Sequence, residues 1–224
     1  INQVVQLAII LFAVPQEYIT QCFNADVLDD LVELMHVESC ELTDNVFFAL
    51  SNAADKNDAL SQLFAARQVL KEADTRMDAL RGDERAYFSV LGNYYALVCT
   101  LLCDGTASEE EGVRYTHAMV RSYALHYEHL KPFEGVLVNH LLDFSTEASN
   151  DHLEEVAHTK HFPAVMHRLG LLIALDDSAA FECARIIGNF TSVTDDSIPE
   201  KVPMSVFRDV YDKYYLSAEK DMFK

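Results

Sequence analysis

Four asparagines recur at the same place in an apolar helical pattern, and this recurrence constrains the fold more than any other feature of the chain. They are Asn52, Asn93, Asn139 and Asn189, separated by steps of 41, 46 and 50 residues. Two, three and six residues before each asparagine the side chain is apolar, and these positions share one side of a helix. Counting back 41 residues from Asn52 leads into another apolar stretch, residues 7–13, which lacks the asparagine. A period of about 40 to 50 residues predicts stacked helical repeats.

The positions four and seven residues before each asparagine lie on its own helix face, and they are mixed and mostly polar. One face of each helix is therefore expected to be buried, and the other is free to meet a partner. The candidate partner-binding residues on this second face are Asn45, Phe48, Asn52, Ser89, Asn93, Asn139, Glu182, Arg185 and Asn189. The sequence leaves open a structural alternative, in which the asparagines tie neighbouring repeats together or cap a turn.

Turn-forming residues are scarce in this chain. The 7 glycines and 5 prolines are about 5% of the 224 residues, against a usual share of about 12%. A β-rich chain needs more turn formers than that. The long periodic runs, such as the helices expected over 69–81 and 84–103, therefore predict an all-α protein.

The repeats are expected to form a single domain over residues 1–224. Full repeats are predicted over 15–55, 56–103, 113–145 and 151–193, and partial ones over 1–14 and 203–224. Because the chain opens on Ile1 inside an apolar helix, we interpret it as a fragment of a longer array. Inserted loops are expected at 104–112, which contains three consecutive glutamates, and at 145–151.

The charge is strongly negative, with 36 acidic and 17 basic residues and a formal net charge of −19. Such a chain repels the phosphates of nucleic acids and anionic membrane surfaces. A basic or extended protein segment is the compatible partner, although the charge also serves solubility. The apolar run 4–14 is too short to span a bilayer and contains Gln6, so we expect no membrane insertion.

The five cysteines are an odd number in mostly apolar helical contexts, which predicts free thiols in a reducing compartment. We therefore expect a cytoplasmic protein, with nuclear and cytoskeletal or ciliary locations left open. Cys99 and Cys103 have the i, i+4 spacing of two metal thiolates, but no second ligand pair accompanies them, so core cysteines are the preferred interpretation. The histidines 152, 158, 161 and 167, and the pair 126 and 129, allow a metal or pH-sensing site; packing histidines are the default.

No sequence signature of catalysis is present. A glycine-rich phosphate loop, the G-x-S-x-G and H-E-x-x-H motifs and a C-x-x-C pair are all missing from the sequence. We therefore expect no enzyme activity, no cofactor and no metal. An all-α enzyme would need a concave pocket with perturbed titratable groups, and no cluster in the sequence indicates one.

Three helices per repeat and a third helix of the form apolar-apolar-Gly-Asn-apolar resemble armadillo repeats. The best matches are Ile186–Phe190 with the preceding Phe162–Leu169, and Phe48–Ala53. The resemblance covers nearly the whole chain and implies a right-handed α-solenoid whose third helices line a concave groove. It also implies that the asparagines bond the backbone of an extended peptide, because a primary amide offers both a donor and an acceptor. Armadillo import receptors carry a tryptophan four residues before this asparagine, whereas this chain contains none and has an aromatic residue there only at Phe48.

Solenoids offer long surfaces, and their usual work is binding. The leading hypothesis is a scaffold or adaptor that holds a partner segment in an acidic concave groove. The alternative is a regulatory solenoid that binds a folded GTPase, motor or cytoskeletal (axonemal) protein through its convex face or inserted loops.

Overall fold

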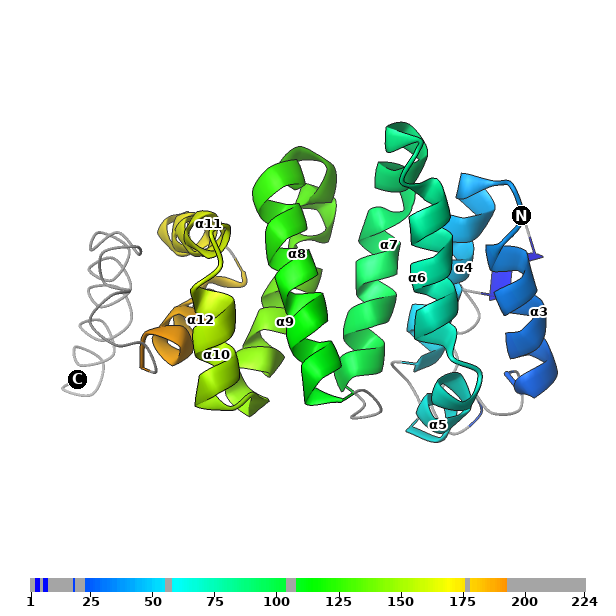
Figure 1. Cartoon of the computed structure of the whole chain (residues 1–224), viewed down its shortest axis with the longest axis horizontal. Coiled ribbons are helices and arrows are strands. Elements are labelled where there is room, and N and C mark those ends of the chain that lie inside the picture. The colour runs from blue at the N-terminus through cyan, green and yellow to red at the C-terminus, as the bar shows by residue number, and fades with distance from the viewer. Residues whose placement is uncertain are drawn as a thin grey trace. The chain divides into compact units, whose positions relative to one another are not determined.

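The computed structural model in Figure 1 describes residues 3–4, 6–7, 18, 23–54, 58–103, 108–175 and 178–192. Every regular element in these ranges is a helix, which confirms the prediction of an all-α protein. The expected partial repeat 203–224 and most of 1–14 lie outside the described residues. The solenoid arrangement of armadillo repeats stays a prediction.

The chain divides into two compact units, which are described separately. The first comprises Ile1–Ser108 with His129–Phe133, and the second comprises Glu109–Glu128 with Glu134–Lys224. Helices of the first unit are α3 (Ala25–Met35), α4 (Cys40–Ala54), α5 (Asp58–Ala66), α6 (Val69–Leu80), α7 (Glu84–Cys103) and the short 3₁₀ helix η1 (Lys131–Phe133). Helices of the second are α8 (Glu109–Leu130, whose last two residues belong to the first unit), α9 (Glu134–Glu147), α10 (Asn150–Ala157), α11 (Phe162–Ala174) and α12 (Ala180–Ser192).

The first unit has two layers of helices. Helices α4 and α7 pack side by side, while α3 and α6 pack on each other and cover α4 and α7. The side chains of Phe47 and Tyr94 meet inside the unit, with ring centroids 5.9 Å apart, and the Tyr94 hydroxyl donates to Asp74 of α6 at 2.6 Å. The apolar residues that the sequence pattern assigned to the buried face of α4, among them Val46, Ala49 and Leu50, are fully buried.

A buried arginine holds the two layers of the first unit together. Arg76 of α6 donates from Nε to the Thr43 hydroxyl at 3.1 Å, and from Nη2 to the Val37 carbonyl at 2.9 Å. Thr43 in turn donates to the backbone at the end of α3. One guanidinium thus bonds to the turn between α3 and α4, where the chain passes from one layer to the other.

The second unit contains two more neighbouring helices of the predicted third-helix type, α9 and α12. They pack on each other, α11 packs on α12, and α10 contacts both α11 and α12. The rings of Phe162 and Phe190 meet at 4.8 Å between centroids in this core. Helix α8 is bonded to α9 through the buried pair Thr116 and His140, 2.7 Å apart. Its backbone leaves helical geometry at His126.

The loops predicted at 104–112 and 145–151 are shorter than expected. Helix α8 begins at Glu109, so the three glutamates form its first turn, where negative side chains interact favourably with the positive end of the helix dipole. Helix α9 continues to Glu147, and α10 begins at Asn150 with Ser149 as its N-cap. The polar residues at both places therefore begin or end helices and do not form long insertions.

No helix among the described residues is long and apolar enough to cross a membrane.

Candidate protein-binding surface

The exposed row of α4 contains three of the predicted partner-binding residues. Asn45, Phe48 and Asn52 follow one another at helical spacing and are half-buried or exposed, with Phe48 39% exposed. Asn45 donates its amide to the Glu41 carbonyl of its own helix at 2.7 Å. This row combines amides with an accessible aromatic ring, as expected for a surface that meets a partner.

The matching row of α7 contains Ser89 and Asn93, followed by Ala96 and Thr100. Ser89 donates its hydroxyl to Ala86 of the same helix at 2.7 Å, and its side chain is accessible. Thr100 donates to the Ala96 carbonyl at 2.9 Å. Ser89 is exposed and the other three residues are half-buried, so this row of α7 is partly accessible to solvent.

Two polar bridges join the rows of α4 and α7 into one surface. Asn93 donates its amide to Oδ1 of Asp44 at 2.8 Å. Ser51 and Thr100 meet at 3.2 Å between hydroxyl oxygens, and Thr100 accepts because its own proton goes to Ala96. We call this surface the α4–α7 face; its residues are Glu41, Asp44, Asn45, Phe48, Ser51, Asn52, Ser89, Asn93, Ala96 and Thr100. The structure thus brings five predicted residues onto one face of the first unit.

The register between α4 and α7 differs from the sequence repeat. Both bridges join residues 49 positions apart, which means that the helices run parallel, whereas the step from Asn52 to Asn93 is 41 residues. The difference of eight residues corresponds to about 12 Å along a helix axis. Helix α7 has 20 residues against 15 in α4, and its additional turns lie at its N-terminal end. Asn93 is therefore beside Asp44 and not beside Asn52.

The α4–α7 face is acidic. Helix α4 contains Glu41 and Asp44 and neither lysine nor arginine, and the one basic residue of α7 is Arg85 in its first turn. Asp44 is partly buried, and this burial raises the pKa of its carboxyl; the hydrogen bond from Asn93 partly opposes the shift. A positively charged side chain placed beside a half-buried carboxyl stabilises its charged form.

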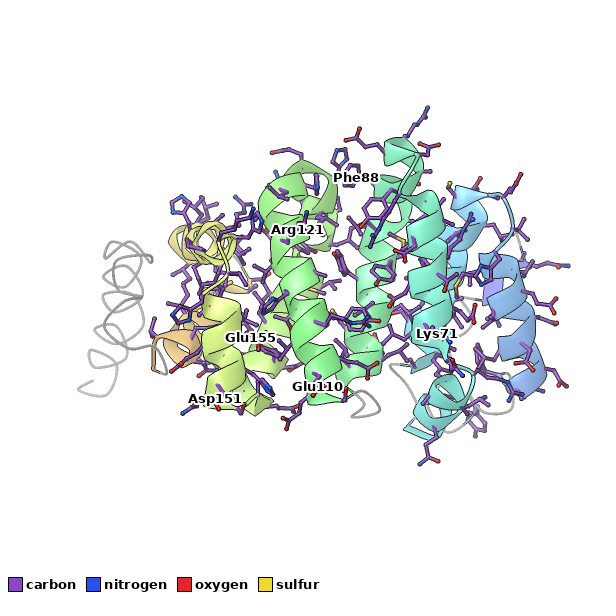
Figure 2. The ribbon with its side chains drawn as sticks, viewed as in Figure 1. Lys71, Phe88, Glu110, Arg121, Asp151 and Glu155 are labelled. Atoms are coloured by element: carbon purple, nitrogen blue, oxygen red, sulfur yellow. The ribbon has the colours of Figure 1, made fainter. Side chains whose placement is uncertain are left out.

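One flank of α7 is covered by the segment His129–Phe133. The His129 ring stacks on Phe88, with centroids 4.4 Å apart and an interplanar angle of 4°. The Phe133 ring lies directly on Gly92, where a Cβ atom would meet it at 2.2 Å. Figure 2 labels Phe88 on α7. The glycine before Asn93 therefore serves a close aromatic contact, a role that its sequence motif does not indicate.

The other four predicted residues belong to the second unit. Asn189 of α12 donates its amide to the Ser145 hydroxyl of α9 at 3.1 Å, while Asn139 and Arg185 are exposed and Glu182 is half-buried in the first turn of α12. Asn189 thus bonds α9, as Asn93 bonds α4. For these two asparagines the observed bond joins two packed helices, as the structural alternative expects.

No group of three or more His, Cys, Asp and Glu side chains in the described part of the chain is arranged to hold a metal ion. Cys99 and Cys183 are buried and Cys40 is a half-buried free thiol, whereas Cys22 and the Cys103 side chain lie outside the described residues. His158 ends α10 and a turn separates it from His161, so these two histidines do not share a helix.

Polar clusters that sequence reasoning missed lie between the helices of the second unit. His152 faces Glu109 at 3.7 Å, and His117 faces Glu155 at 3.8 Å. Figure 2 labels Glu155 on α10 and Glu110 on α8. Arg168 donates to Glu134 at 2.7 Å and also contacts the hydroxyl and the ring face of Tyr127. The partners are 34 to 43 residues apart, a separation at which no local pattern signals a contact.

Comparison with models of known families, with curated proteins and with solved structures found no match. The class that the described residues define is an all-α protein with an acidic, partly polar surface on two parallel helices.

Proposed function

We propose that this protein is a non-catalytic scaffold or adaptor of armadillo-like architecture, which binds a basic segment of a partner protein on its third helices. The observation that carries the proposal is the α4–α7 face. It joins two rows of exposed or half-buried amides and hydroxyls to the exposed Phe48 ring. Solenoid proteins bind partners on surfaces of this kind.

The electrostatics support a basic partner. The face contains Glu41 and Asp44, and the whole chain has a net charge of −19. Complementary charge speeds encounter and selects against acidic competitors. The proposal includes a cytoplasmic location, which rests on the odd number of cysteines in the chain and on the free thiol of Cys40.

The alternative, a regulatory solenoid that binds a folded GTPase, motor or cytoskeletal protein, relied partly on a long inserted loop. Because the three glutamates of that predicted loop belong to α8, the described structure gives this alternative less support.

Two matched charge insertions test the proposal. Phe48→Lys places a positive charge on the α4–α7 face. The control, Leu125→Lys, places a positive charge at an exposed apolar residue outside this face, on α8, where Leu125 is 53% exposed. The immobilised full chain and both variants are used to capture proteins from cell extract, and the captured proteins are quantified by mass spectrometry. We expect one partner to fall by about tenfold or more with Phe48→Lys only, as for loss of a central contact. Equal capture by both variants would reject the α4–α7 face as the binding surface.

A further inference from the structure

The distance between the two polar bridges of the α4–α7 face matches the distance between residues i and i+7 of a helical ligand. Asp44 and Ser51 are seven residues apart on α4, and Asn93 and Thr100 are seven apart on α7. Seven residues of α-helix rise about 10.5 Å, so the bridges mark two points at that distance along the line where α4 and α7 pack on each other. Phe48 and Ala96 lie between them in sequence, which places an apolar stretch between two polar ones.

From this spacing we infer that the α4–α7 face binds a basic amphipathic α-helix of a partner protein. An extended segment covers about 10.5 Å in about three residues, and residues i and i+3 of a strand point to opposite sides. A β-strand therefore presents no two same-facing side chains at this spacing. A helix lying along α4 and α7 covers the same distance between residues i and i+7, which share one face.

The side chains at each bridge, and Phe48 between the bridges, determine which ligand residue can bind there. At the first bridge, one amide hydrogen of Asn93 is directed to Asp44, and the second carboxylate oxygen and the amide oxygen are acceptors that suit a lysine or arginine. At the second bridge the hydroxyls of Ser51 and Thr100 suit an amide or a hydroxyl. Phe48 between them suits an apolar side chain. From Asp44 towards Ser51 the ligand therefore presents a cation, an apolar residue three or four positions on, and a polar residue at the seventh.

Charge favours this occupant over an acidic helix. Helix α4 carries two carboxylates and no lysine or arginine, and burial raises the pKa of the Asp44 carboxyl, a shift that the hydrogen bond from Asn93 only partly opposes. A lysine or arginine of the ligand beside Asp44 stabilises the charged form of this carboxyl. The inference rests on the proposed function and adds to it the conformation and residue pattern of the partner.

Fluorescence polarisation with the full chain tests the inference. The probe is a side-chain-stapled helical peptide of about 15 residues with Lys, Leu and Gln at i, i+4 and i+7. The comparison peptide keeps these three residues and has two prolines in place of the two stapled residues, which prevents helix formation. We expect the stapled peptide to bind and Asp44→Asn to weaken it about tenfold, with a further loss at high salt. Glu110→Gln, which removes an exposed carboxylate on α8, should leave binding unchanged. Asp44→Asn keeps an acceptor for Asn93, and a Phe48→Ala variant gives a second, uncharged test.

Each other outcome overturns the inference. Equal or tighter binding of the proline peptide means an extended occupant, which leaves the proposed function intact. Equal binding of a stapled peptide with Glu in place of Lys means that the face does not select a cation. No binding of either peptide rejects this face as a helix site, and partner capture with Phe48→Lys then decides separately whether the proposed function survives.

Discussion

The side-chain amide of Asn93 donates a 2.8 Å hydrogen bond to the carboxylate of Asp44, and this bond joins α7 to α4. Asn189 makes the equivalent type of bond to Ser145 in the second unit. The sequence left open whether these asparagines serve a ligand or the stack of repeats. In both units the observed bond joins two packed helices. Mutation of Asn93 or Asn189 should therefore affect stability more than mutation of the exposed Asn139.

Replacing Asn93 by alanine should lower the free energy of unfolding by about 1 to 2 kcal/mol, because Asp44 is left partly buried without its donor. Asn139→Ala should change it by less than about 0.5 kcal/mol, since that side chain is exposed. Urea unfolding followed by circular dichroism measures both. Equal losses for the two variants would mean that the Asp44–Asn93 bond contributes nothing to stability.

The two Gly-Asn pairs of the chain should respond in opposite directions to alanine. Glycine inside a helix is less stable than alanine by about 1 kcal/mol. A Cβ at Gly188 meets nothing within 4 Å, so Gly188→Ala should stabilise the protein by up to that amount. A Cβ at Gly92 would lie 2.2 Å from the Phe133 ring, so Gly92→Ala should cost about 1 to 3 kcal/mol through displacement of that ring. Thermal and urea unfolding of both variants give the comparison.

A double substitution isolates the cause at Gly92. In a Phe133→Ala background the ring is gone, and Gly92→Ala should then become stabilising, as at Gly188. If Gly92→Ala is as harmful without Phe133 as with it, the contact between the ring and the glycine is not what requires glycine at this position.

The helices could be predicted from the sequence because their signals are local. The apolar periodicity of residues 84–103 predicts a helix, and α7 occupies those residues. The prediction of a loop at 109–111 is wrong, because these residues form the first turn of α8. Three glutamates suit a solvated linker and a helix N-terminus equally well. Only the rest of α8 decides between the two.

The surface could be predicted in part. Helical spacing places Asn45, Phe48 and Asn52 on one face of α4, and this much follows from the sequence. The neighbour of Asn93 does not follow, because the register of α4 against α7 depends on where each helix starts and on how their buried sides pack. Gly92 and Gly188 occupy the same motif, yet only Gly92 has an aromatic ring against it.

Arg76 should be among the most sensitive polar residues of the first unit. Its side chain is buried, the residue being 8% exposed, and donates to the Thr43 hydroxyl and the Val37 carbonyl. Arg76→Ala should cost about 3 kcal/mol, because both acceptors lose a charged donor and a cavity remains. Arg81→Ala is the matched control: its side chain is 73% exposed in a surface pair with Asp78 and should cost less than about 0.5 kcal/mol. A small effect at Arg76, measured by urea unfolding, would mean that water replaces its hydrogen bonds.

The buried histidine of the second unit should make the protein less stable in acid. Burial lowers the pKa of His140 to about 4, and its Nε2 lies 2.7 Å from the Thr116 hydroxyl. The unfolded chain takes up a proton at this residue near pH 6.5, whereas the folded chain does so only near pH 4. Stability is therefore complete above pH 6.5 and falls between pH 6.5 and 4, by up to about 3 kcal/mol at the lower end. His140→Gln, which keeps a polar group beside Thr116, should flatten this part of the curve of unfolding free energy against pH, and His167→Gln at an exposed site should leave it unchanged. An identical acid slope in His140→Gln and the parent protein would show that other groups govern the loss of stability.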